Sequence, residues 1–103
     1  MIKYGIVYSD DADRDLNNLF DIIFYEYSAP LTAYRYVKGV IKTIKSLSVF
    51  PESYPIEYSQ SFAKYGVNVR RINYKKMTII YTVSEQVVYV HRIIAGSLIT
   101  DFD

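Results

Sequence analysis

Residues 67–94, VNVRRINYKKMTIIYTVSEQVVYVHRII, decide the fold. β-Branched and aromatic residues dominate this stretch and alternate with polar ones, which predicts three strands. The strands cover residues 67–74, 77–84 and 87–94. Lys75-Lys76 and Glu85-Gln86 separate them as short turns. Consecutive strands joined in this way form an antiparallel meander.

A strand and a helix are predicted upstream of the meander. Residues 2–8, IKYGIVY, are short and rich in strand-forming residues. Ser9 stands where a helix N-cap is wanted, and the aspartates after it complement the positive end of a helix. Apolar residues spaced three or four apart then predict a helix from Ala12 to about Ser28. The acidic run has neither the turn glycine nor the closing glutamate of a calcium loop, so we interpret it as helix chemistry and predict no metal site.

A second helix is predicted from Pro30 to Leu47, with proline in its first turn. Its outer positions are basic, and we interpret them as a solvated face. These residues are Arg35, Lys38, Lys42 and Lys45. Residues 48–66 form a long connection that we expect to be pinned by aromatic side chains. They are Phe50, Tyr54, Tyr58 and Phe62.

The predicted order of elements is therefore β-α-α-β-β-β. This order defines an α+β fold in which a helical hairpin packs on one face of an antiparallel sheet. A chain of 103 residues is long enough for one such domain, so we expect residues 1–103 to form a single unit. The last residues, about seven of them, are expected to be a short tail that frays.

Composition narrows the classes of protein. The sequence has no cysteine, which excludes disulfides, thiolate metal sites and cysteine nucleophiles. It has no apolar run long enough to span a bilayer and no signal-peptide pattern at its start, so we expect a soluble cytoplasmic protein that does not contact membrane. Residues 1–30 hold six acidic and two basic side chains, whereas the rest hold ten basic and five acidic ones. This polarity favours an anionic partner for the second part of the chain.

Several segments, taken together, resemble the RelE/ParE family of bacterial toxins. Ser9, Ala12, Asp15 and Leu16 resemble the opening of the family's first helix. The apolar run that ends at Leu47, followed by Phe50-Pro51, resembles the end of its second helix. In the sheet, VRRINYKKMTIIYTV resembles the family's arginine-to-tyrosine strand pattern, with Arg70 and Tyr81 at those positions, and VVYVHRIIAG resembles its last strand. Ala12, Leu16, Pro51 and Tyr81 are thus family-pattern structural residues.

The resemblance implies a toxin of a type II toxin–antitoxin, or plasmid stabilisation, system. Such a toxin inhibits growth and is neutralised by a cognate antitoxin protein. RelE-like members cut messenger RNA in the ribosome, whereas ParE-like members poison DNA gyrase. The resemblance leaves open whether this chain forms a homodimer or a toxin–antitoxin hetero-oligomer, and it implies no cofactor.

Two residues are candidates if the chain cleaves RNA. The resemblance implies that Arg70 stabilises phosphate, and its guanidinium has the geometry for that role. His91, the single histidine, could accept a proton, although a lone histidine among apolar neighbours is typical of a hydrogen-bonded core-edge residue. Alternation places it on the face of Val87, Tyr89 and Ile93. Candidates for binding phosphate or a partner are Arg70, Arg71, Lys75, Lys76 and Arg92.

The segment after Gly96 decides between the two branches. RelE-like nucleases carry a basic and an aromatic residue there, whereas this chain reads SLITDFD, without lysine, arginine, histidine or tyrosine. The RNA-cleaving set is therefore incomplete. We favour a ParE-like toxin that binds a macromolecular target such as DNA gyrase. A ribosome-dependent mRNA endonuclease and an inactive family member that binds only an antitoxin are the alternatives.

Overall fold

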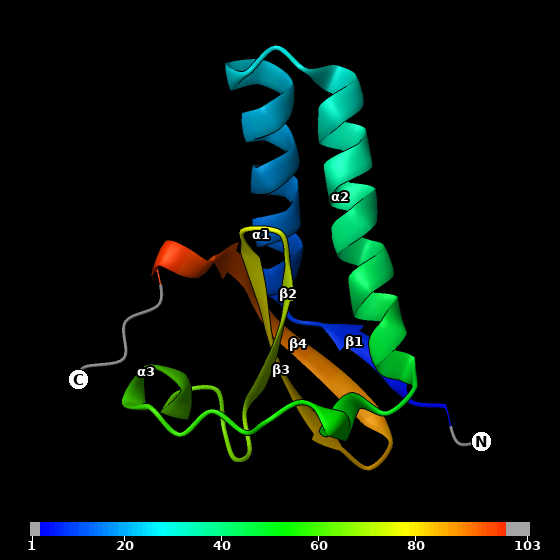
Figure 1. The fold of residues 1–103 in the computed structure, drawn as a ribbon, viewed down its shortest axis with the longest axis vertical. Helices are drawn as coiled ribbons and strands as arrows, with labels where there is room; N and C mark the ends of the chain where they lie inside the picture. The colour runs from blue at the N-terminus through cyan, green and yellow to red at the C-terminus, as the bar shows by residue number, and fades with distance from the viewer. Residues whose placement is uncertain (1–2, 99–103) are drawn as a thin grey trace.

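The computed structural model describes residues 3–98 (Figure 1). Its helices and strands follow the predicted β-α-α-β-β-β order, with a short extra helix in the long connection. They are β1 (Gly5–Tyr8), α1 (Asp10–Asp21), a π-helical turn (Ile22–Glu26), α2 (Pro30–Lys45), α3 (Gln60–Ala63), β2 (Arg70–Tyr74), β3 (Met77–Ser84) and β4 (Val87–Ala95). Single 3₁₀ turns cover Ser46–Ser48, Pro51–Ser53 and Gly96–Leu98. Of the predicted tail, residues 99–103 lie outside the described part of the chain.

The four strands form one sheet in the order β1-β4-β3-β2. The predicted antiparallel meander of β2, β3 and β4 is confirmed. The prediction that the whole sheet is antiparallel is wrong, because β1 pairs in parallel with β4, with Gly5 beside Val87 and Tyr8 beside Val90. The helical hairpin and the meander separate β1 from β4 in the chain, and a connection of that length permits either direction.

The predicted N-cap of α1 is confirmed. Ser9 is extended, and its hydroxyl accepts a hydrogen bond from the backbone N–H of Ala12 at 3.0 Å. The predicted first strand was too long, since only Gly5–Tyr8 is paired among the described residues of that stretch. The first helix was predicted to end near Ser28. It passes into the π-helical turn at Ile22 and stops before Ser28, which has a positive φ of 49°.

The helical hairpin covers one face of the sheet, as predicted. Ala12 of α1 and Val40 and Ile44 of α2 are fully buried there. They form one core with sheet residues, namely Ile72, Ile79, Tyr81, Val88, Val90 and Ile93. Figure 1 shows that the far half of the hairpin extends beyond the sheet.

A β-bulge changes the faces of β4. Tyr81 pairs with Val90 and Ile80 pairs with Arg92, so His91 is the extra residue of the bulge. The side-chain alternation restarts after it, and Ile93 joins the helix-facing core. The prediction that Ile93 shares a face with His91 and Tyr89 is therefore wrong, because simple alternation assumes an unbroken ladder.

The start of β2 also differs from the prediction. The strand begins at Arg70 rather than at residue 67, because Asn68 has a positive φ of 55° that no extended strand permits. Val67 is 81% exposed as a result. Val69 is buried with Phe62 and Ile80 in a smaller core on the face opposite the hairpin.

Two of the four aromatic residues expected to pin the long connection do so. Phe62 of α3 is buried in the smaller core, and Tyr54 packs against the main one. Phe50 and Tyr58 are 67% and 87% exposed, so the prediction is wrong for them. Phe50 lies at a positive φ of 55° just before the 3₁₀ turn.

Gly39 of α2 allows a close approach between the hairpin and Tyr74 of the sheet. A Cβ atom at this position would lie 2.1 Å from the hydroxyl oxygen of Tyr74. We expect Gly39→Ala to destabilise the protein by ~1–2 kcal/mol, because the Tyr74 ring must move away. In an unobstructed helix the same change would stabilise by ~1 kcal/mol. Chemical denaturation measures whether the free energy of unfolding falls or rises.

Two variants control this prediction. Gly5→Ala should be nearly neutral, because its nearest contact would be Val87 Cγ2 at 4.0 Å. In a Tyr74→Leu variant, which lacks the obstructing ring, Gly39→Ala should be less destabilising than it is in the original protein. A Gly39→Ala variant as stable as the original protein would contradict the close approach of Tyr74 to α2.

Candidate binding site on the open face

Arg70 and Arg71, adjacent in sequence, lie on opposite faces of β2. The guanidinium of Arg70 donates hydrogen bonds to two backbone carbonyls of the long connection, Glu52 O at 3.0 Å and Tyr54 O. These carbonyls belong to the 3₁₀ turn Pro51–Ser53 and to the residue that follows it. Arg70 therefore holds the connection against the sheet, and its hydrogen-bonding capacity toward a ligand is partly used.

Tyr81 holds the same turn from the neighbouring strand. It pairs with Arg70 in the ladder, is fully buried, and donates a 2.6 Å hydrogen bond to the carbonyl of Pro51. Burial raises the pKa of the Tyr81 phenol, so the group stays a donor. Pro51 and Ala12 are buried and Leu16 packs against the main core. All four family-pattern residues thus contribute to packing.

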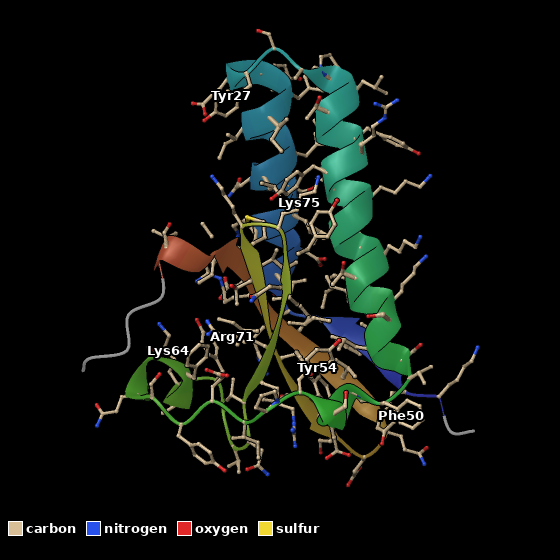
Figure 2. The ribbon with its side chains drawn as sticks, viewed as in Figure 1. Tyr27, Phe50, Tyr54, Lys64, Arg71 and Lys75 are labelled. Atoms are coloured by element: carbon tan, nitrogen blue, oxygen red, sulfur yellow. The ribbon has the colours of Figure 1, made fainter. Side chains whose placement is uncertain are left out.

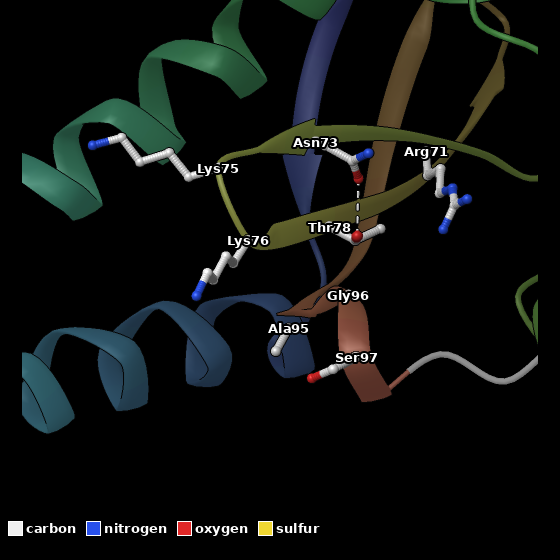
Figure 3. Close-up of a pocket in the computed structure, with 8 residues that line it drawn as sticks. All are labelled: Arg71, Asn73, Lys75, Lys76, Thr78, Ala95, Gly96 and Ser97. Atoms are coloured by element: carbon white, nitrogen blue, oxygen red, sulfur yellow. Dashed lines mark hydrogen bonds between the residues drawn. The ribbon is translucent and has the colours of Figure 1, made fainter.

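A pocket of about 570 Å³ opens on the face away from the helical hairpin, near the β2–β3 turn (Figure 3). Three residues predicted to bind phosphate or a partner line it together: Arg71, Lys75 and Lys76. The remaining lining residues are Asn73, Thr78, Ala95, Gly96 and Ser97. In the wall of the pocket, the Thr78 hydroxyl donates to Asn73 Oδ1 at 2.9 Å.

The three basic side chains of this pocket spread apart. Figure 3 shows Lys75 and Lys76 extending from the turn at one end and Arg71 at the other. The Lys75 ammonium lies 5.5 Å from the ring centroids of both Tyr36 and Tyr74. Arg71 lies 5.7 Å from the Phe62 ring and 3.7 Å from a carboxylate oxygen of Glu57. The charges therefore attract anions over an extended area rather than converge on one atom.

Arg92 lies outside this pocket. Its guanidinium donates to both carboxylate oxygens of Asp15, at 2.7 and 3.0 Å, and this pairing raises its pKa. Asp15 also accepts the backbone N–H of Ile93 at 2.9 Å, where β1 has already ended. The pair thus fastens α1 to the free edge of β4. It borders an apolar hollow of about 280 Å³ that includes Leu19 and Leu98.

His91 is also outside the pocket. Its Nε2 lies 2.8 Å from the Thr82 hydroxyl, and its ring lies 5.8 Å from that of Tyr65. Burial lowers its pKa, which favours the neutral ring. The bulge places it among these neighbours, apart from Arg70 and from the lysines of the turn.

The structure thus gathers three of the predicted residues and separates the other three. Arg70, His91 and Arg92 each serve a structural contact of their own. Sequence reasoning missed Asn73 and Thr78 as pocket residues. The predicted turn at Lys75-Lys76 implied their pairing across the ladder, and that register was the available signal. Within residues 3–98, no cluster of three or more histidine, cysteine or carboxylate groups could hold a metal ion.

The described part of the chain contains no helix that is long and apolar enough to cross a membrane. What the site offers chemically is positive charge with an amide and a hydroxyl between the charges. These groups bind phosphate or carboxylate oxygens. Together with the fold, they define a small α+β protein with positive charge on its open face.

Comparison with known proteins places this fold in a family. The family model of the ParE toxin of the type II toxin–antitoxin system parDE matches residues 6–98. The chain belongs to this family, and the ParE-like branch is the one supported. No curated protein sequence matches it significantly.

Solved structures with a similar fold include two from toxin–antitoxin systems. One is described as the chromosomal ParDE toxin–antitoxin system from P. aeruginosa, with a TM-score of 0.75 and 15% identity over 92% of this chain and 98% of that one. The other is the toxin–antitoxin complex RelBE2 from Mycobacterium tuberculosis, with a TM-score of 0.65 and 17% identity over 94% and 95%. The predicted RelE/ParE resemblance is confirmed.

Tyr81→Phe tests the buried hydrogen bond to Pro51. The change leaves a carbonyl without its donor, and we expect a loss of ~1–3 kcal/mol in the free energy of unfolding. Tyr89→Phe, at a side chain that is 40% exposed on the next strand, is the matched control and should change stability by less than ~0.5 kcal/mol. Equal stability of the two variants would show that the Tyr81 hydroxyl does not hold the turn.

His91 predicts a pH dependence of stability. Its pKa is lowered in the folded state, so the unfolded chain binds a proton first as the pH falls below ~6.5. The free energy of unfolding should therefore decrease on acidification from pH 7.5 to 5.5, by at most ~1.4 kcal/mol per pH unit from this group. His91→Gln should flatten that decrease in denaturant titrations. An unchanged slope would contradict the assignment.

Proposed function

We propose that this ParE-family toxin stops growth by binding a macromolecular target, DNA gyrase, and that a cognate antitoxin neutralises it. The observation that carries the binding mechanism is the spread of the three cations in the open pocket. Lys75 and Lys76 extend from the turn, and Arg71, which also pairs with Glu57, lies at the other end of the pocket. Charge spread in this way suits an extended anionic surface.

The distribution of catalytic candidates supports the same proposal. Cleavage of RNA through a ribose hydroxyl requires a proton acceptor and a cation at the same phosphate. Arg70 is engaged with the carbonyls of Glu52 and Tyr54, and His91 with Thr82, on different parts of the sheet. The pocket that holds the remaining cations adds an amide and a hydroxyl. It is therefore better suited to hold a partner than to transfer protons.

An antitoxin partner is supported by the relatives. Both similar structures are described as toxin–antitoxin systems or complexes, and each aligns over more than nine-tenths of this chain. We propose that this chain is likewise controlled by a protein encoded beside it. A short neighbouring reading frame with a DNA-binding start and an acidic or amphipathic end is the expected gene.

Controlled expression in bacteria tests the target. We expect growth arrest with filamentation and a DNA-damage response, while messenger RNA stays intact in transcript-end mapping. Co-expression of the neighbouring reading frame should restore growth. Cells that express the toxin should give at least about tenfold fewer surviving colonies than cells with an empty vector.

Two outcomes contradict the proposal in different ways. Codon-biased cuts in messenger RNA without DNA damage would establish the endonuclease alternative. Normal growth of cells that contain soluble toxin would establish the inactive alternative, in which the chain retains antitoxin binding alone. An immunoblot provides the necessary measure of the toxin level.

A further inference from the structure

The segment after Leu98 is acidic. Residues 99–103 read ITDFD, and they carry Asp101 and Asp103 without a basic side chain. We call residues 99–103 the acidic tail. It lies outside the described part of the chain, so the surface beside Leu98 determines what its side chains can reach. The tail brings two negative charges to that surface.

The acidic tail begins at the rim of the basic pocket. Gly96 and Ser97 belong to the lining of that pocket, together with Arg71, Lys75 and Lys76. The backbone N–H of Gly96 donates to the carbonyl of Lys76 at 2.9 Å, which ties the end of β4 to the β2–β3 turn. In the view of Figure 3, Gly96 and Ser97 lie between Lys76 on one side and Arg71 on the other.

The acidic tail is long enough to cover this pocket. An extended chain spans ~3.3 Å per residue, so Asp101 can lie up to ~10 Å beyond Leu98 and Asp103 up to ~17 Å. Because the tether is so short, the effective concentration of the two carboxylates at the pocket is in the millimolar range. A contact that would be weak between separate molecules can therefore form within this chain.

The two lysines of the pocket lack a carboxylate partner. Within residues 3–98, neither Lys75 nor Lys76 forms an ion pair, and both are exposed. Arg71 differs, since it already lies 3.7 Å from a carboxylate oxygen of Glu57. The two ammonium groups therefore match the two carboxylates of the acidic tail in number and complement them in charge.

The apolar hollow that Leu98 lines is a poorer site for the acidic tail. Phe102 would suit its apolar lining, but the cation in that lining, Arg92, is already paired with Asp15 through two hydrogen bonds. The carboxylates that flank Phe102 in the sequence would gain no ionic partner there, and a charge that leaves water without a partner is costly. Charge therefore favours the basic pocket.

We propose that the acidic tail folds back over the basic pocket, where Asp101 and Asp103 pair with Lys75 and Lys76. An anionic partner must displace the tail before it occupies the pocket, so the tail lowers the affinity of the free protein for such partners. Exposed ion pairs are weak and are screened by salt, so a strongly anionic partner displaces the tail. The effect on the partner rests on the proposed function, whereas the contact between tail and pocket does not.

A matched pair of double variants tests the contact. The test variant combines Asp101→Asn with Asp103→Asn. The control variant combines Glu52→Gln with Glu85→Gln, which also removes two negative charges from exposed residues. Glu85 follows the eight residues of β3, about 23 Å from the β2–β3 turn along the strand. Figure 2 shows Phe50, two residues before Glu52, well separated from that turn.

NMR spectroscopy of the purified full chain reports on the contact without any partner. We expect the backbone amide signals of Lys75 and Lys76 to move in the test variant, relative to the unaltered chain, and to stay in place in the control variant. Raising the salt concentration should move the signals of the unaltered chain toward those of the test variant, because salt screens exposed ion pairs.

Inorganic tripolyphosphate measures whether the acidic tail competes for the pocket. It is titrated at ~0.1 M salt, where exposed charges more than ~10 Å apart are largely screened. We expect the test variant to bind it at least about threefold more tightly than the unaltered chain, and the control variant to stay within about 1.5-fold. In a chain that also carries Lys75→Gln and Lys76→Gln, neutralising the tail should give no gain, because interacting sites are not additive.

Three results overturn the inference. Unmoved signals of Lys75 and Lys76 in the test variant exclude the contact. Movement that follows Phe102→Ala but not the test variant places the acidic tail in the apolar hollow instead. Equal affinity of the test and control variants for tripolyphosphate, or no affinity in either, overturns the competition for the pocket.

Growth inhibition separates this inference from the proposed function. We expect the test variant to reach half-maximal inhibition with at least about threefold less protein than the control variant. If the lysine signals move but the two variants are equally toxic, the target does not use the basic pocket, so the proposed binding mechanism fails while the contact stands. Cutting of messenger RNA by the unaltered chain contradicts the proposed target and leaves the contact in place.

Discussion

The buried hydrogen bond from Tyr81 to the Pro51 carbonyl is the constraint on which the arrangement of this molecule depends. Tyr81 is the largest fully buried side chain of the described residues, and its hydroxyl reaches the start of the long connection. Arg70, its neighbour across the ladder, holds the carbonyls that follow. These two side chains attach the 3₁₀ turn Pro51–Ser53, and with it the long connection, to the sheet.

The same constraint determines what remains for function. Since Arg70 holds the connection, Arg71 on the opposite face is the arginine left near the open pocket. The lysines of the β2–β3 turn extend from the other end of that pocket, and His91 is fixed at a bulge away from it. The cations are therefore distributed for contact with a surface. Beyond the end of β1, the Asp15–Arg92 ion pair attaches α1 to the edge of β4.

Much of the fold follows from local chemistry in the sequence. The turns of the meander, the Ser9 cap and the proline that begins α2 act over a few residues, and each was predicted. The parallel direction of β1 was not, because no short turn links it to β4. The bulge at His91 and the left-handed conformation of Asn68 interrupt the strand pattern, so alternation misplaced Ile93 and the start of β2.

The site was harder to predict than the fold. The prediction from sequence placed Arg70 in one group of phosphate- or partner-binding candidates with Arg71, Lys75 and Lys76. The role of Arg70 depends on two carbonyls 16 and 18 residues earlier in the chain, which the strand pattern does not indicate. Predicting that Asn73 and Thr78 pair in the pocket requires the register of the β2–β3 turn, because the identity of neither residue indicates it.

A cleavage-complex assay with purified toxin, purified DNA gyrase and supercoiled plasmid tests action by binding most directly. If the chain acts in this way, protein-linked broken DNA should accumulate in proportion to toxin, and translating ribosomes given the same toxin should keep their messenger RNA intact. Unperturbed gyrase together with cut ribosomal messenger RNA would contradict a binding mechanism.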